Sequence, residues 1–353
     1  RARNPGTFDF GLYARSRGYC GQVYGEDVRI LDNTSEIPYL EGIRILKKRC
    51  GEILEQVCDP RDLGVFQAVV LGDQSQMDPQ LRDMYQRHGI SHLLAVSGQH
   101  LTILGGSLYL LLRRMGVRQF GSGLICGLAV ISYGILTGSS GSAMRAVVMI
   151  LCLWLGAFLG RTYDSLSAMG LAAVVLLWQR PYMLFQSGFQ LSFGAVWAIA
   201  GPGAWLCQRL GGSKGWQKTL IISLSVQLVL TPMVVWHYFR HPFYGLLLNL
   251  LVMPMAAGLI YSGAGAVLLG AFGVWPGRMA AGTGHFILLI YEGFCGVFER
   301  LPGWSLLLGR PGPGQLAAYG LCMGLLAAAL FWSGRLAAGK EKRNIGETGR
   351  FWR

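Results

Sequence analysis

Polar side chains that could do chemistry interrupt the apolar stretches of this chain at a few places. In residues 89–100, the side chains of His92, Ser97 and His100 stand among aliphatic neighbours. A polar group in lipid must find a partner or water, so a cluster of them predicts a cavity. Polar groups that satisfy one another inside a helix bundle are the alternative interpretation. The pair Ser97-Gly98 favours a break in the helix.

A Gly/Ser turn in residues 137–142 precedes an apolar helix that carries Arg145 near its start. Backbone N–H groups at a helix start are free, and with the helix dipole they attract an anion. We therefore expect an anion such as phosphate to contact Ser139, Ser140, Ser142 and Arg145. An arginine inside a membrane helix is costly unless it faces water or a partner. The alternative is that its long side chain reaches lipid headgroups.

Two further polar segments carry weaker signals. Asp164 is a natural N-cap for the helix that follows it, and Arg161 is expected to pair with it as a structural ion pair. Gln186 and Gln190 are four residues apart and would share a helix face, with Ser192 close by. This second segment fits a lined cavity and interhelical hydrogen bonds about equally well.

Several kinds of catalytic centre have no support in the sequence. No Gly-x-x-x-x-Gly-Lys-Ser/Thr loop is present, which argues against ATP hydrolysis by a P-loop. No His-Glu-x-x-His motif or clustered acid pair offers metal-assisted hydrolysis. The eight cysteines form no Cys-x-x-Cys pair, and Cys50 and Cys58 lie too far apart along a helix for a disulfide. We therefore predict no catalytic residue, no metal site and no cofactor.

Composition predicts that most of the chain lies in a membrane. The 353 residues are 52% hydrophobic and 14% charged, whereas a soluble domain carries about 25% charged residues. Tryptophans stand near the ends of the apolar runs, as membrane-interface residues do. We expect an all-α polytopic membrane protein with seven to nine membrane elements, some of them re-entrant. The long run that begins near residue 243 is expected to break at Pro254. The apolar runs are 92–112, 122–138, 143–160, 164–178, 183–201, 219–236, 243–271, 283–298 and 315–333.

The predicted domain organisation has four parts. Residues 1–36 read as the C-terminal remnant of a small β domain, with a strand between Gln22 and Leu31, and residues 37–90 as amphipathic juxtamembrane helices that lie on the bilayer or pack beside it. Residues 91–334 form the transmembrane domain, and residues 335–353 a basic tail. Because the chain opens without methionine, we expect a piece of a longer protein.

The charges are unevenly distributed. Residues 101–330 hold 13 Lys and Arg against three acids, Asp164, Glu292 and Glu299, which leaves a net charge of +10. The positive-inside rule for cytoplasmic loops explains much of this excess. A route lined for a polyanion is the sharper interpretation.

The order of these motifs resembles the competence domain of the ComEC family, the inner-membrane DNA channel of natural transformation, over about residues 37–333. The resemblance implies passage of single-stranded DNA across the bacterial cytoplasmic membrane, with a DNA receptor protein and a cytoplasmic ATPase as partners. It also implies that residues 1–36 end an OB-like domain. The family's metallo-β-lactamase-like nuclease motif is absent from this chain, and Gln99 departs from the aliphatic residue expected there. The matching motifs are Leu71-Gly72-Asp73, residues 89–100, Leu136-Thr137-Gly138, Arg145-Ala146, residues 160–164 and residues 188–193.

On this interpretation, the chain is a channel that contacts the DNA backbone without reading its sequence. The Ser139–Arg145 segment would hold phosphate, and the expected channel-lining residues are His92, Ser97, His100, Gln190 and Ser192. Membrane lipid is a further partner, and a homo-oligomer and either membrane orientation stay open. Two alternatives are an intramembrane serine hydrolase and a small-solute transporter. The first would use Ser97 with His237 or His285 as base, and the second would have helices broken near Pro254 and Gly98.

Overall fold

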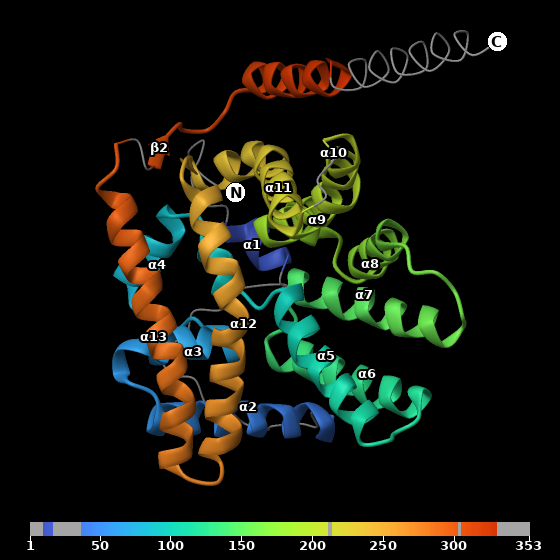
Figure 1. The fold of residues 1–353 in the computed structure, drawn as a ribbon, viewed down its shortest axis with the longest axis vertical. Coiled ribbons are helices and arrows are strands. Elements are labelled where there is room, and N and C mark those ends of the chain that lie inside the picture. Colours follow the sequence, from blue (N-terminus) through green and yellow to red (C-terminus); the bar gives the residue numbers. More distant parts are fainter. Residues whose placement is uncertain (1–9, 17–36, 211–213, 303–304, 330–353) are drawn as a thin grey trace, which may run out of the picture.

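The computed structural model describes residues 10–16, 37–210, 214–302 and 305–329, and Figure 1 shows that this part of the chain is almost entirely helical. The helices of its first half are α1 (Phe10–Ser16), α2 (Pro38–Val57), α3 (Pro60–Leu71), α4 (Pro79–Arg87), η1 (Ser91–Leu93), α5 (Gly98–Arg114), α6 (Gln119–Leu136) and α7 (Gly141–Phe158). Those of the second half are α8 (Ser165–Gln179), η2 (Pro181–Phe185), α9 (Ser187–Ala198), η3 (Ile199–Gly203), α10 (Ala204–Arg209), α11 (Gly215–Tyr238), α12 (Gly245–Gly270), α13 (Val274–Glu299) and a helix at Pro313–Ala329. Two short strands, β1 (Arg240–Pro242) and β2 (Ser305–Leu307), pair antiparallel.

Local sequence explains where several helices start. Asp59 and Asp78 each stand one residue before a proline, and their side chains accept hydrogen bonds from backbone N–H groups at 3.0 and 2.9 Å. Proline suits the first helical position because its fixed φ and missing N–H cost nothing there. Asp164 caps α8 in the same way, accepting from the backbone N–H of Ser167 at 2.7 Å.

Five helices in the described residues are long and apolar enough to cross a membrane: α6, α7, α11, α12 and α13. Two further helices, α8 and the helix at Pro313–Ala329, are also apolar but shorter. The prediction of an all-α polytopic membrane protein is therefore confirmed. The apolar runs that were predicted as further elements fold into shorter helices, such as α5, α8 and α9.

The predicted break at Pro254 is wrong. Helix α12 runs without interruption through Pro254 for 26 residues, about 39 Å at 1.5 Å per residue. Proline is tolerated in a membrane helix because neighbouring helices and local adjustments satisfy the backbone group that it frees. Helix α13 lies antiparallel beside α12 over its whole length (Figure 1), and a Cβ on Gly277 would lie 2.8 Å from the Cα of Gly270. The small residues allow the two backbones to approach closely.

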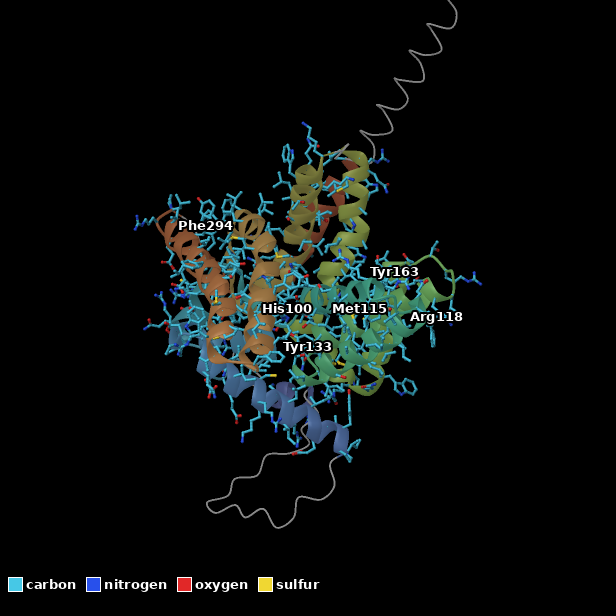
Figure 2. All side chains as sticks on the ribbon, turned by 60° about the horizontal axis from the view of Figure 1, so that its bottom comes forward. His100, Met115, Arg118, Tyr133, Tyr163 and Phe294 are labelled. Carbon is cyan, nitrogen blue, oxygen red and sulfur yellow. The ribbon has the colours of Figure 1, made fainter. Side chains whose placement is uncertain are left out.

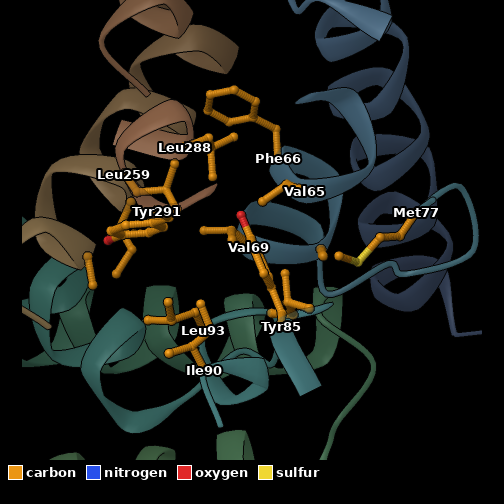
Figure 3. Packing of buried hydrophobic residues seen from close by; sticks show 14 of the residues in the cluster. Val65, Phe66, Val69, Met77, Tyr85, Ile90, Leu93, Leu259, Leu288 and Tyr291 are labelled. Carbon is orange, nitrogen blue, oxygen red and sulfur yellow. The ribbon is translucent and has the colours of Figure 1, made fainter. Parts of the chain in front are cut away.

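The largest core joins α3 and α4 to α12 and α13. Figure 3 shows Val65, Phe66 and Val69 of α3 facing Leu259 of α12 and Leu288 of α13. Helix α3 is therefore buried inside the bundle, whereas α2 runs across the ends of α12 and α13 (Figure 1). That residues 37–90 lie on the bilayer or pack beside it stays a prediction.

The second part of the molecule is built from α5, α6 and α7, which share a core that includes Leu101, Val130 and Val147. Helices α8 and α9 continue it through a smaller cluster around Leu176 and Phe189. The first and second parts meet where α5 contacts α12 and α2 contacts α6. This meeting place brings the motif of residues 89–100 next to the turn that begins α7.

Two sequence predictions concern the ends of the chain. The strand expected between Gln22 and Leu31 and the basic tail 335–353 lie outside the described residues. Residues 10–16 were assigned to the β remnant, but they form helix α1 and contact η2.

Candidate functional site

Ser97 and Gly98 mark the start of α5, as the sequence predicted. Ser97 is the N-cap residue, and His100, three residues on, turns its ring back toward it. The Nδ1 atom of His100 accepts a hydrogen bond from the backbone N–H of Ser97 at 3.3 Å and lies 3.0 Å from the Ser97 hydroxyl oxygen. This reciprocal arrangement satisfies donors that would otherwise stay free at the helix start.

The other ring nitrogen of His100 has no protein partner. Since Nδ1 is an acceptor, Nε2 carries the proton of the neutral ring and is a donor. His100 is 3% exposed, and its Nε2 makes no hydrogen bond to any described residue. Figure 2 places His100 near the middle of the molecule. A buried donor without a partner costs about 1–3 kcal/mol, so this group favours a ligand that accepts a hydrogen bond.

The turn before α7 contacts this same region. Gly138 and Ser139 take left-handed backbone conformations, with φ of 87° and 51°, and the Ser140 side chain caps α7 by accepting from the backbone N–H of Ala143 at 3.3 Å. The Ser142 hydroxyl donates to the carbonyl of Val96 at 3.1 Å. The two motifs singled out in the sequence are therefore neighbours in space.

Arg145 lies inside the protein. It is 8% exposed, its Nε donates to the Ser192 hydroxyl of α9 at 2.9 Å, and its guanidinium carbon lies 5.9 Å from the centre of the Phe193 ring. Its Nη1 contacts only the sulfur of Met149, at 3.5 Å. No ion pair joins Arg145 to a carboxylate among the described residues. The alternative in which this side chain reaches lipid headgroups is wrong, because the surrounding helices enclose it.

The guanidinium of Arg145 also lies against the first turn of α5. A Cβ placed on Gly98 would lie 3.3 Å from Nη2 of Arg145. The N-terminus of a helix is equivalent to about +0.5 of a charge, so two positive groups meet here without an acid between them. This arrangement is suited to binding an anion.

Gln190 belongs to a second polar contact, between α9 and α11. Its side-chain N–H donates to the carbonyl of Leu184 at 2.9 Å, and its oxygen lies 2.8 Å from Nε2 of His237. Because an amide oxygen only accepts, His237 donates through Nε2. Sequence reasoning considered His237 only as a possible base and missed both this contact and Phe193. A polar residue 47 positions from its partner leaves no spacing signal.

The remaining predicted residues are more peripheral. His92 is exposed, and its Nδ1 lies 3.2 Å from the carbonyl of Gly89. The expected ion pair between Arg161 and Asp164 does not form. The Asp164 carboxylate accepts hydrogen bonds from Ser167 at the start of α8, which lowers its pKa, and the Arg161 side chain is exposed.

The hydrolase alternative is poorly supported by the geometry. Neither proposed base faces Ser97, because His237 is bonded to Gln190 and His285 to Asp62. The histidine that does touch Ser97 is His100, but no carboxylate within the described residues orients its ring as a catalytic triad would require. The described residues also contain no group of three or more His, Cys, Asp or Glu side chains that could hold a metal ion.

Comparison with known proteins gives a family match over most of the chain. Residues 69–334 match the family model described as "Competence protein". The chain is 26% identical over 329 residues to "ComE operon protein 3" of Bacillus subtilis (strain 168), which covers 92% of this chain and 42% of that protein. It is 30% identical over 151 residues to "Competence protein ComA" of Neisseria gonorrhoeae, covering 39% of this chain and 22% of that protein. The chain thus spans less than half the length of either relative, and no solved structure matches it.

Proposed function

Because this chain belongs to the competence protein family, we propose that it forms the membrane channel through which single-stranded DNA enters a bacterial cell during natural transformation. The channel lies in the cytoplasmic membrane, which suits a protein with five helices long enough to cross a bilayer. A DNA receptor protein delivers the strand, and a cytoplasmic ATPase supplies the driving force.

The observation that best supports this proposal is the positive, acid-free site between α5 and α7. Arg145 and the first turn of α5 both present positive charge, and a phosphate offers acceptor oxygens and the opposite charge. A phosphodiester is present at every nucleotide, so such a contact holds the strand whatever its base sequence.

The side chains around Arg145 suit a single strand better than a duplex. Phe193 lies within reach of the guanidinium, and aromatic rings in single-strand channels stack with bases. Ser97, Gln190 and Ser192 add neutral polar groups, and the turn of Ser139, Ser140 and Ser142 extends the polar surface at the start of α7. Exposed His92 stands before the loop that leads into α5. We assign these residues to the lining of the channel.

Arg145→Ala in the full-length protein tests the proposal. Uptake of labelled DNA should fall while the amount of protein in the membrane stays unchanged, and DNAs of different base composition should be affected alike. Arg145→Lys should restore uptake only in part, because lysine keeps the charge but loses the planar, forked donors. Arg180→Ala, at an exposed position after α8, is the matched control and should take up DNA normally. Normal uptake by a well-expressed Arg145→Ala variant would show that this arginine does not bind the strand.

A further inference from the structure

Helix α13 carries a stripe of ionisable side chains on one face. Arg278, His285, Glu292 and Glu299 follow one another at intervals of seven residues. Seven residues are nearly two helical turns, so these side chains share one face with a drift of about 20° at each step. We call these four residues the ionisable stripe. They extend over about 32 Å of helix, close to the thickness of the hydrocarbon core of a bilayer.

Three members of the ionisable stripe have partners from the helices before the channel. The Nδ1 of His285 donates to the carboxylate of Asp62 at 2.6 Å, and Glu292 accepts from Arg61. Further along, Glu299 lies 4.0 Å from Nε2 of His88. Asp62 and Arg61 are both in α3, which is buried beside α12 and α13. Their pairs with His285 and Glu292 therefore lie along the side of α13, a membrane-capable helix.

An open cleft gives access to the first of these pairs. The cleft has a volume of about 440 Å³, and Arg278, His285 and Asp62 line it together with Asp59 and apolar side chains of α2, α3 and α13. The side chain of Asp62 is 5% exposed, whereas that of His285 is 36% exposed. The histidine is therefore the more exposed member of the pair at the cleft.

The charged groups around His285 come from several elements. Arg61 and Asp62 are in α3, Asp59 precedes α3, and Arg278 and Glu292 are on α13 itself. Helix α12 contains no acidic, basic or histidine residue along its length.

The ionisable groups at the end of α2 have partners of their own or stay neutral. Glu52 pairs with Lys48 at 3.9 Å, and Glu55 accepts from Gln76 at 3.4 Å. Burial and the neighbouring Asp62 raise the pKa of the Cys58 thiol to about 12, so it stays a neutral thiol.

We propose that His285 and Asp62 form a proton-binding site, filled from the cleft, at one end of a proton path along the ionisable stripe. Nε2 of His285 takes a proton from water in the cleft, and Nδ1 passes its own proton to the Asp62 carboxylate. One proton enters and one leaves the ring, which is left with its proton on Nε2. After Asp62 releases its proton onward, a flip of the ring turns this N–H toward the carboxylate and an unprotonated nitrogen toward the cleft, and the site is reset. Ionisable groups in membrane helices mark proton relays when they pair in this way, because their burial is otherwise costly.

The site does not depend on the nature of the transported molecule. It uses none of the residues assigned to the DNA channel, so the two proposals can fail independently. A purely structural ionisable stripe, which only holds α3 against α13, is the competing explanation, and it requires hydrogen bonding at these positions but no proton exchange.

Proton flux into vesicles separates the two explanations. The full-length protein is reconstituted into liposomes that contain a pH-sensitive dye, and a potassium diffusion potential drives protons inward. The wild-type protein should acidify the interior faster than empty vesicles. His285→Gln and Asp62→Asn keep a hydrogen bond between these positions but hold no transferable proton, and both should lower the flux to that of empty vesicles.

Two controls interpret the result. His241→Gln changes a histidine on β1, outside the ionisable stripe, and Arg180→Ala changes an exposed cation after α8; both should conduct protons like the wild type. If Asp62→Asn fails to insert, the partly exposed His285→Gln decides the question. Wild-type flux no faster than that of empty vesicles, or a His285→Gln protein that conducts normally, would overturn the proposal.

Discussion

Replacing Arg145 by methionine should separate the stability of this protein from its function. Arg145 is a charged group held in the interior without a carboxylate among the described residues. Its compensation consists of the Ser192 hydroxyl at 2.9 Å, the Phe193 ring at 5.9 Å and a methionine sulfur. Methionine is long, flexible and apolar, so it fills the same space without a charge.

The expected change in the free energy of unfolding follows from these contacts. Removing an ion from water costs several kcal/mol even after relaxation. A charge-assisted hydrogen bond returns about 1.5–3 kcal/mol, and a ring at the far limit of cation–π range returns about 0.5 kcal/mol. The two sides nearly cancel, so Arg145→Met should leave the stability unchanged or raise it by about 1–2 kcal/mol. Breaking a buried ion pair would instead cost about 3–5 kcal/mol.

Thermal unfolding of the purified full-length protein in detergent, followed by tryptophan fluorescence, measures the first effect. A transformation assay in cells that contain equal amounts of each protein measures the second. We expect Arg145→Met to unfold no earlier than the wild type and to lose DNA uptake. A variant that unfolds with a loss of about 3 kcal/mol or more would refute the reasoning, because Arg145 would then have a buried acidic partner.

Two further outcomes follow from close contacts in the structure. A Cβ on Gly284 would lie 2.5 Å from the ring of Phe66, so Gly284→Ala should lower the free energy of unfolding by about 1–3 kcal/mol. Gly282 has open space around it, so Gly282→Ala should change the free energy of unfolding little in the same thermal measurement. A fluorophosphonate probe should leave Ser97 unlabelled, because the histidine beside it has no carboxylate to orient it. Labelling that disappears in Ser97→Ala would favour the hydrolase alternative.

Composition was enough to predict the fold class, but not the form of each helix. The thickness of the bilayer sets the length of an apolar segment, and its interfaces attract tryptophan. These two features predicted the membrane-capable helices. The break predicted at Pro254 was wrong because the rule that proline ends a helix holds for helices in water. Helix α12 continues through Pro254, as membrane helices can when their surroundings satisfy the freed carbonyl.

Local motifs predicted individual parts of the site and missed their long-range partners. The break at Ser97-Gly98 and the turn before α7 have signatures within a few residues, and both formed as expected. The bond from Arg145 to Ser192 spans 47 residues, and the bond from His285 to Asp62 spans 223. Such contacts depend on how the helices pack, and no spacing in a single sequence encodes that packing.

The structure shows where the few acids of residues 101–330 lie relative to Arg145. Three acids occur in that stretch, and each is engaged away from Arg145: Asp164 caps α8, Glu292 accepts from Arg61, and Glu299 lies beside His88. A positive-inside bias alone would place cations in loops at the membrane surface. It does not account for an arginine enclosed between α7 and α9. Arg145 therefore bears a charge that no carboxylate of the described residues neutralises, and our proposal assigns that role to a bound phosphate.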